Sequence, residues 1–89
     1  MSKEMIGKRF YPTEENTFPN TPGEYMKGEN GRWELCLPTG IHGAINDKVW
    51  KITEHEDGTI TVSPSILVTS SVHTYDWHGY LEKGVWREC

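Results

Sequence analysis

The segment that decides the fold is "WHGYLEKGVWREC", residues 77–89. Its two arms flank Glu82-Lys83-Gly84, and a glycine in third place suits a turn position with positive φ. Along the first arm, side chains alternate between two faces, with Trp77, Gly79 and Leu81 on one and His78 and Tyr80 on the other. This alternation predicts a β-hairpin with one face in the core and the other open to solvent or to a partner. A glycine in mid-strand is typical of a close approach by another group.

Two further triplets, Glu29-Asn30-Gly31 and Glu56-Asp57-Gly58, also end in glycine between strand-like runs. We predict the same loop in all three, a type I turn followed by a G1 bulge, which is the usual three-residue hairpin connection. The run "RWELCLP" (32–38) alternates strictly, and no helix-length amphipathic pattern occurs. The predicted fold is mainly β, a small antiparallel sandwich or partly open barrel built of hairpins.

The first part of the chain, residues 1–22, differs in composition from the rest. Pro12, Pro19 and Pro22 interrupt it, and Asn and Thr lie between them. Proline removes backbone donors, so we expect an irregular, extended arm that packs on the body through its aromatic residues. Together with that arm, residues 1–89 are expected to form a single β domain.

Composition excludes several classes of protein. The formal net charge is −4, and no run of Lys and Arg forms the basic stripe that DNA or RNA binding requires. With neither a long apolar run nor a secretory signal, the chain is expected not to span a membrane. A chain of 89 residues has a thin core, which favours a homodimer or homotetramer.

Motifs for catalysis or metal binding are missing from the sequence. The four histidines have no zinc-ligand spacing and no Cys-x-x-Cys beside them, and no serine lies on a Gly-x-Ser-x-Gly elbow or next to an obvious base. Cys36 and Cys89 are expected as reduced thiols, with one disulfide between them as the alternative. We therefore predict no enzyme, no catalytic residue, no metal and no cofactor.

Two stretches nevertheless carry candidate binding residues. In "TVSPSI" (61–66), serine hydroxyls flank Pro64, as either a kink in an edge strand or a polar cradle for ligand oxygens. The final hairpin adds aromatic side chains and an arginine, which are core in one interpretation and a binding surface in the other. The predicted ligand-binding set is Ser63, Ser65, His78, Tyr80, Trp86 and Arg87.

The same two regions carry a resemblance. The runs "EHEDGTITVSPSILVTS" (54–70) and "WHGYLEKGVWREC" resemble a widespread family of small, uncharacterised bacteriophage proteins, which share the run Asp-Gly-Thr-Ile-Thr-Val-Ser-Pro-Ser-Ile and end in Trp-His-Gly-Tyr-Leu. "PGEYMK" and "WELCLPTGIHG" match it more loosely. Some relatives are labelled ammonia monooxygenase, an activity rejected here because this chain lacks a membrane span and a metal-ligand cluster. Distant relatives carry cysteine and histidine patterns suggestive of metal, but "VTSSVHTY" (68–75) has no cysteine.

The resemblance implies a phage protein in the host cytoplasm. Small phage proteins without catalytic motifs are often inhibitors of host defence, and some sequester cyclic nucleotide alarm signals of the CBASS type. Such a sponge needs aromatic faces for bases, donors for phosphates and symmetric copies to close the pocket. The alternatives are a virion structural or decoration protein, and a protein-binding inhibitor of one host enzyme.

Overall fold

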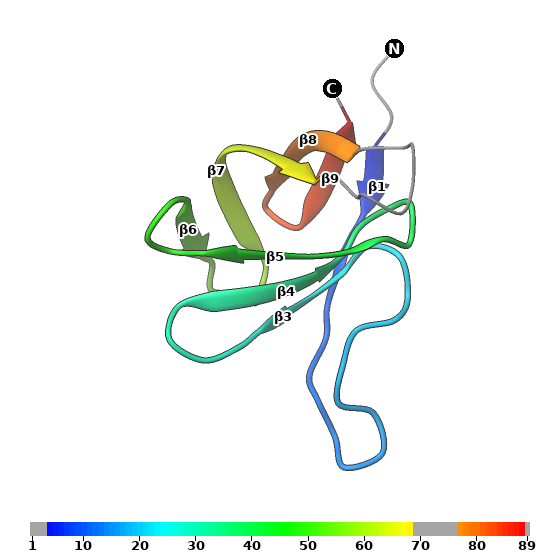
Figure 1. Ribbon diagram of the computed structural model, residues 1–89. Helices are drawn as coiled ribbons and strands as arrows, with labels where there is room; N and C mark the ends of the chain where they lie inside the picture. Colours follow the sequence, from blue (N-terminus) through cyan, green and yellow to red (C-terminus); the bar gives the residue numbers. More distant parts are fainter. Residues whose placement is uncertain (1–3, 69–76, 89) are drawn as a thin grey trace.

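The computed structural model describes residues 4–68 and 77–88, which form two β-sheets packed face to face (Figure 1). The five-stranded sheet has the order β1-β9-β8-β7-β6 and the four-stranded sheet the order β2-β3-β4-β5. The strands are β1 (Glu4–Ile6), β2 (Lys8–Arg9), β3 (Glu24–Lys27), β4 (Arg32–Cys36), β5 (His42–Asn46), β6 (Lys51–Glu54), β7 (Ile60–Val68), β8 (Trp77–Glu82) and β9 (Val85–Glu88). The mainly β prediction is confirmed as a small sandwich, and the described residues form no closed barrel.

One hydrophobic core lies between the sheets. The four-stranded sheet contributes Tyr25, Trp33, Leu35 and Ile45, and the five-stranded sheet contributes Ile60, Val62, Ile66, Trp77, Leu81 and Trp86. The alternation seen in the sequence explains this packing. When a sheet has one buried face, every second residue of each strand points into the core. Strand β8 shows it without exception, with Trp77, Gly79 and Leu81 buried and the residues between them exposed.

The N-terminal arm is more ordered than the sequence indicated. Strand β1 pairs antiparallel with β9, and β2 pairs parallel with β3, so the arm adds one edge strand to each sheet. Gly7 connects β1 to β2, where the chain passes from one sheet to the other. An added Cβ there would come within 2.7 Å of the Trp86 indole nitrogen and 2.8 Å of the Gly84 carbonyl oxygen. Within the described part of the arm, residues 10–22 follow the predicted irregular path and form a loop that projects from the sandwich (Figure 1).

The three glycine turns are present, but only one has the predicted geometry. In the β6–β7 connection Gly58 has φ 89° and the loop closes between His55 and Thr59, as a type I turn with a G1 bulge requires. In the other two, Asn30 and Lys83 share positive φ with the glycine that follows, which is the type I′ pattern. The loop between β8 and β9 therefore has two residues instead of three, and Glu82 pairs with Val85.

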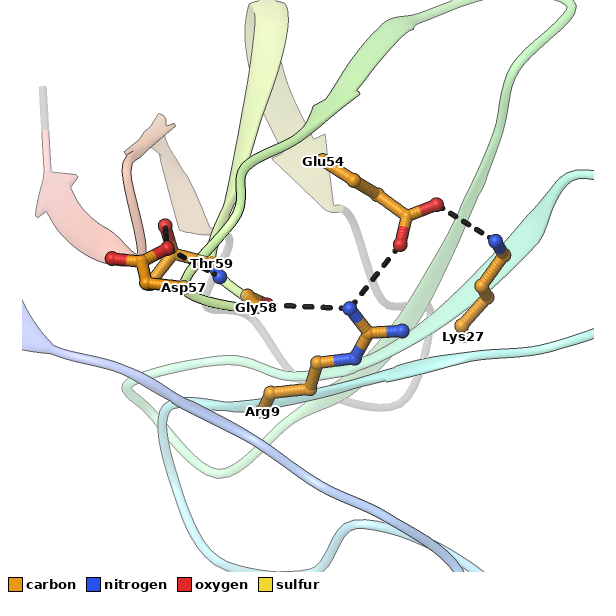
Figure 2. A network of polar contacts seen from close by, with 6 residues as sticks. All are labelled: Arg9, Lys27, Glu54, Asp57, Gly58 and Thr59. Carbon is orange, nitrogen blue, oxygen red and sulfur yellow. Dashed lines mark hydrogen bonds and ion pairs between the residues drawn. The ribbon is translucent and has the colours of Figure 1, made fainter.

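Ion pairs join the edges of the two sheets beside the β6–β7 hairpin (Figure 2). Glu54 of β6 accepts a hydrogen bond of 2.7 Å from Lys27 of β3 and one of 3.2 Å from Arg9 of β2. Arg9 also donates to the Gly58 carbonyl oxygen, and its guanidinium lies 5.1 Å from the Trp33 ring centroid. The hydrogen bond from Lys27, and to a lesser extent that from Arg9, lowers the pKa of Glu54 below its ordinary value. This cluster ties the arm and both sheets together.

Candidate functional site

The solvent-facing side of the five-stranded sheet brings together most of the predicted binding residues. We call this surface the outer face and define it by the exposed or half-exposed side chains that alternate with the core positions of β7, β8, β9 and β1. Its members are Ser63, Ser65, Leu67, His78, Tyr80, Glu82, Val85, Arg87, Glu4 and Ile6. Five of the six predicted binding residues belong to it.

A serine and a histidine meet on this face. The His78 imidazole Nε2 lies 2.9 Å from the Ser65 hydroxyl oxygen. The strand pairing shifts between Val62 and Ile66, around the cis Ser63–Pro64 peptide bond, and Leu67 then pairs with His78. In the sheet β7 lies between β6 and β8, but its pairing with β6 ends at Ser63, so from Pro64 onward the strand pairs with β8 alone. The fold thus brings a histidine beside Ser65, although no serine adjoins an obvious base along the sequence.

This contact does not by itself make a hydrolytic site. Attack by a serine hydroxyl needs the base to be oriented by a third group and needs donors for the oxyanion. No carboxylate among residues 4–68 and 77–88 hydrogen-bonds His78. The Ser65–His78 pair can instead act as a polar anchor, since an exposed hydroxyl and imidazole can both donate to ligand oxygens.

Tyr80, Arg87 and Glu4 form a row across three adjacent strands. Tyr80 pairs with Arg87, and Arg87 pairs with Glu4. The Arg87 Nε donates to a Glu4 carboxylate oxygen at 2.8 Å, with each side chain about half exposed. An exposed ion pair of this kind contributes only about 0–1 kcal/mol. A ligand phosphate could therefore replace the Glu4 carboxylate at small cost.

Trp86 does not belong to the outer face, so it does not lie with the other predicted binding residues. Its side chain is 1% exposed, stacks edge-to-face on Trp77 at 5.4 Å between ring centroids, and donates through Nε1 to the Gly23 carbonyl oxygen at 2.8 Å. The length of the β8–β9 turn explains this placement. A three-residue loop would have paired Tyr80 with Trp86, whereas the two-residue loop pairs Tyr80 with Arg87, and a shift of one residue exchanges the two faces.

Ser63 lies apart from the Ser65–His78 pair. It is exposed and pairs across the strands with Lys51 of β6, whereas Ser65 contacts His78 of β8, so the two serines on either side of Pro64 have different neighbours. Lys51 was missed by the sequence analysis, although the alternating run "VWKITEHE" places it opposite the core-facing Ile52. It is the cation nearest to Ser63 in the strand register, and it adds positive charge at the β6 end of the outer face.

A cleft at the edge of the sandwich was also missed. It has a volume of about 290 Å³ and opens beside β1 and β9, with walls from both sheets. Met5, Trp77 and Trp86 form the wall of the five-stranded sheet, and the turn between β4 and β5 forms the other. No sequence signal pointed to it, because its walls come from four separate segments of the chain.

A second hollow lies at the tips of the β6–β7 and β8–β9 hairpins, lined by polar side chains that include His55, Asp57 and Lys83. The Thr61 hydroxyl links the two tips, with the His55 imidazole at 2.7 Å and the Lys83 amide donating at 2.9 Å. The Thr59 hydroxyl and amide both donate to Asp57 and hold the pKa of that carboxyl below its ordinary value. These hydrogen bonds pair the polar groups of the hollow with one another and hold the two hairpin tips together.

The predictions about metal binding, thiols and membrane spanning can be compared with the structure only over residues 4–68 and 77–88. Residues 4–68 and 77–88 hold no group of three or more potential metal-ligating side chains, and the cysteine-free segment "VTSSVHTY" lies mostly outside the described residues. Cys36 is a free, buried thiol whose pKa is raised by burial, and Cys89 also lies outside the described residues. The described ranges contain no helix that could cross a bilayer.

Comparisons with protein-family models, with curated proteins and with solved structures returned no match to this chain. The resemblance to phage proteins therefore stays a prediction.

Proposed function

We propose that this chain is a phage-encoded, non-enzymatic binding protein that counteracts host defence by sequestering a cyclic nucleotide signal in the host cytoplasm. The observation that carries the proposal is the outer face, where the Ser65–His78 pair, Tyr80 and Arg87 lie on neighbouring strands of one sheet. The phage setting rests on the resemblance, and the class of ligand rests on the chemistry of these side chains.

Each part of a nucleotide has a matching group on this face. Tyr80 is 42% exposed and offers a ring for a base, and such stacking contributes roughly 1–3 kcal/mol per base. The Arg87 guanidinium presents two parallel donors that fit phosphate oxygens, and charged hydrogen bonds of this kind are about twice as strong as neutral ones. Ser65 and His78 add donors for a second phosphate or a ribose hydroxyl.

A second copy of the chain completes the proposed site. The outer face is a sheet surface, and apart from Glu4 its members do not line either of the two hollows described above. Ile6 is 87% exposed and Leu67 is 57% exposed on the same face, so apolar surface remains for subunit contact. A dimer or tetramer that packs through this face would enclose the nucleotide between copies. Sedimentation should give an oligomer, and a monomer at tens of micromolar would contradict this part.

The direct test is capture and release. Purified full-length protein is incubated with a panel of cyclic di- and trinucleotides, separated from free ligand and denatured by heat. Intact nucleotide should be recovered, whereas a cleaved product would indicate a nuclease and absence of any retained nucleotide would contradict the proposal. His78→Ala with Arg87→Ala should abolish capture. Lys48→Ala, which removes a positive charge from the exposed β5–β6 turn, is the matched control and should retain it.

The exposed Ile6 and Leu67 also favour one competing role, a virion structural or decoration protein that uses the outer face as a contact. Mass spectrometry of purified particles separates the two roles, since stoichiometric presence in virions contradicts a sponge. A pull-down from infected host lysate with wild-type protein and the double variant tests the third role, inhibition of a host enzyme. Specific retention of one enzyme with no retained nucleotide would favour that role.

A further inference from the structure

The cleft beside β1 and β9 is lined by both apolar and charged side chains. Its walls are mainly apolar, formed by Met5, by Pro38 on the opposite sheet and by the edges of two indoles that are otherwise buried. Its volume of about 290 Å³ is at the lower end of the range for small-molecule sites. An apolar slot of this size accommodates a short aliphatic chain.

The charged groups at the cleft are carboxylates. Glu88 of β9 is half-buried on the same side of its strand as Trp86, and Glu4 of β1 lines the cleft nearby. Arg87 donates to one Glu4 oxygen, so Glu4 is partly neutralised. No residue among 4–68 and 77–88 forms an ion pair with Glu88, and the described lining contains no lysine or arginine. Glu88 is therefore the principal charge that a ligand would meet.

We infer that this cleft binds an organic ammonium ion carried on a short aliphatic chain. The ammonium group lies against Glu88, with Glu4 and the Thr39 hydroxyl as further acceptors, and the chain lies along Met5 and Pro38. The indole edges exclude water from the inner end, which strengthens the attraction between the two charges. This ligand has the opposite charge from the proposed nucleotide, and its main contact, Glu88, lies outside the outer face, although Glu4 borders both sites. The inference therefore does not rest on the proposed function.

The experiment uses full-length protein and three ligands of matched length, titrated calorimetrically at low ionic strength. These are n-butylammonium, n-butanol and n-butyrate. Butylammonium should bind, butanol should bind at least about tenfold more weakly because it lacks the charge-assisted hydrogen bond, and butyrate should not bind. Equal binding of butylammonium and butanol, or no binding of butylammonium at millimolar concentration, would overturn the inference without any variant being made.

A variant then locates the site. Glu88→Gln keeps the shape of the side chain and removes its charge, and it should weaken butylammonium binding by about tenfold or more. Glu82→Gln makes the same change on the exposed side of β8, outside the cleft, and should leave binding within about twofold, as expected for a screened surface charge. Equal losses in the two variants would show attraction to the acidic surface as a whole and would refute a site in the cleft. Nucleotide capture by Glu88→Gln should equal that of the wild type, which separates the two proposals.

Discussion

The two faces of the β8–β9 hairpin differ in what constrains them, although they are built from alternate residues of the same strands. On the inner face, Trp77, Gly79 and Trp86 contact one another or neighbouring backbone, and each is buried. On the outer face, His78 and Arg87 form hydrogen bonds with polar, partly exposed neighbours. The inner face is thus determined by packing, and the outer face is free to serve recognition. Substitutions can test this difference between the two faces, beginning with the inner face, where the largest loss of stability is expected.

Trp86→Ala should cause the greatest loss of stability. It removes a buried indole from the core, together with its hydrogen bond to the Gly23 carbonyl oxygen and its contact with Trp77. Loss of a buried aromatic side chain costs about 3–5 kcal/mol of unfolding free energy. Urea denaturation followed by circular dichroism measures the change. A loss below about 1 kcal/mol would show that the inner face is not the packed side.

Gly79→Ala tests close packing on the inner face with a single methyl group. An added Cβ would overlap the Arg87 carbonyl oxygen and come within 2.6 Å of the Trp77 ring, so strand and ring must move apart. Overpacking of this kind costs about 1–3 kcal/mol. Ala44→Gly, at an exposed position in the middle of β5, is a control for backbone flexibility alone and should cost less than about 1 kcal/mol. Equal losses in the two variants would contradict the close approach at Gly79.

The ion-pair cluster of Figure 2 lies between these extremes, because it joins the sheets while Glu54 and Lys27 are open to solvent. The folded-state pKa of Glu54 is lowered, so its contribution is present above the unfolded value near 4.5 and is lost as pH falls through the folded value. Glu54→Gln should therefore be less stable than wild type at pH 7, by under about 1 kcal/mol, and the difference should become smaller as the pH falls to 3. Urea titrations of Glu54→Gln and of the exposed control Glu56→Gln at both pH values measure this. A difference of the same size at pH 7 and pH 3 would refute the electrostatic origin.

The contrast between the faces also explains what the sequence could predict. Alternation alone identifies the core positions of β8, and it places His78 and Tyr80 together on the exposed side. It does not decide the register between strands, which depends on whether a loop has two or three residues. Trp86 lies away from the other predicted binding residues because the β8–β9 loop is one residue shorter than predicted.

Other features depend on contacts between distant segments, and no local pattern encodes them. The bulge between Val62 and Ile66 sets the meeting of Ser65 and His78, and the pairing of β1 with β9 sets the meeting of Glu4 and Arg87. Strand β5 was missed because "HGAIN" contains only one buried hydrophobic residue, Ile45. The cleft was missed for the same general reason, since apolar and acidic residues from separate strands meet only in the folded chain.

The smallest expected change in stability is at the outer face, and it is the most informative. His78→Ala and Arg87→Ala each remove an exposed contact, so each should alter the unfolding free energy by no more than about 0.5 kcal/mol. The same two changes together should abolish nucleotide capture. Arg87→Lys sharpens the comparison, because it retains the charge but not the planar pair of donors, and capture should fall while stability stays unchanged. Paired measurements of denaturation and capture on the same preparations decide the matter. Stability and capture falling together would mean that the outer face serves the fold as well, and unchanged capture in the double variant would remove His78 and Arg87 from the proposed site.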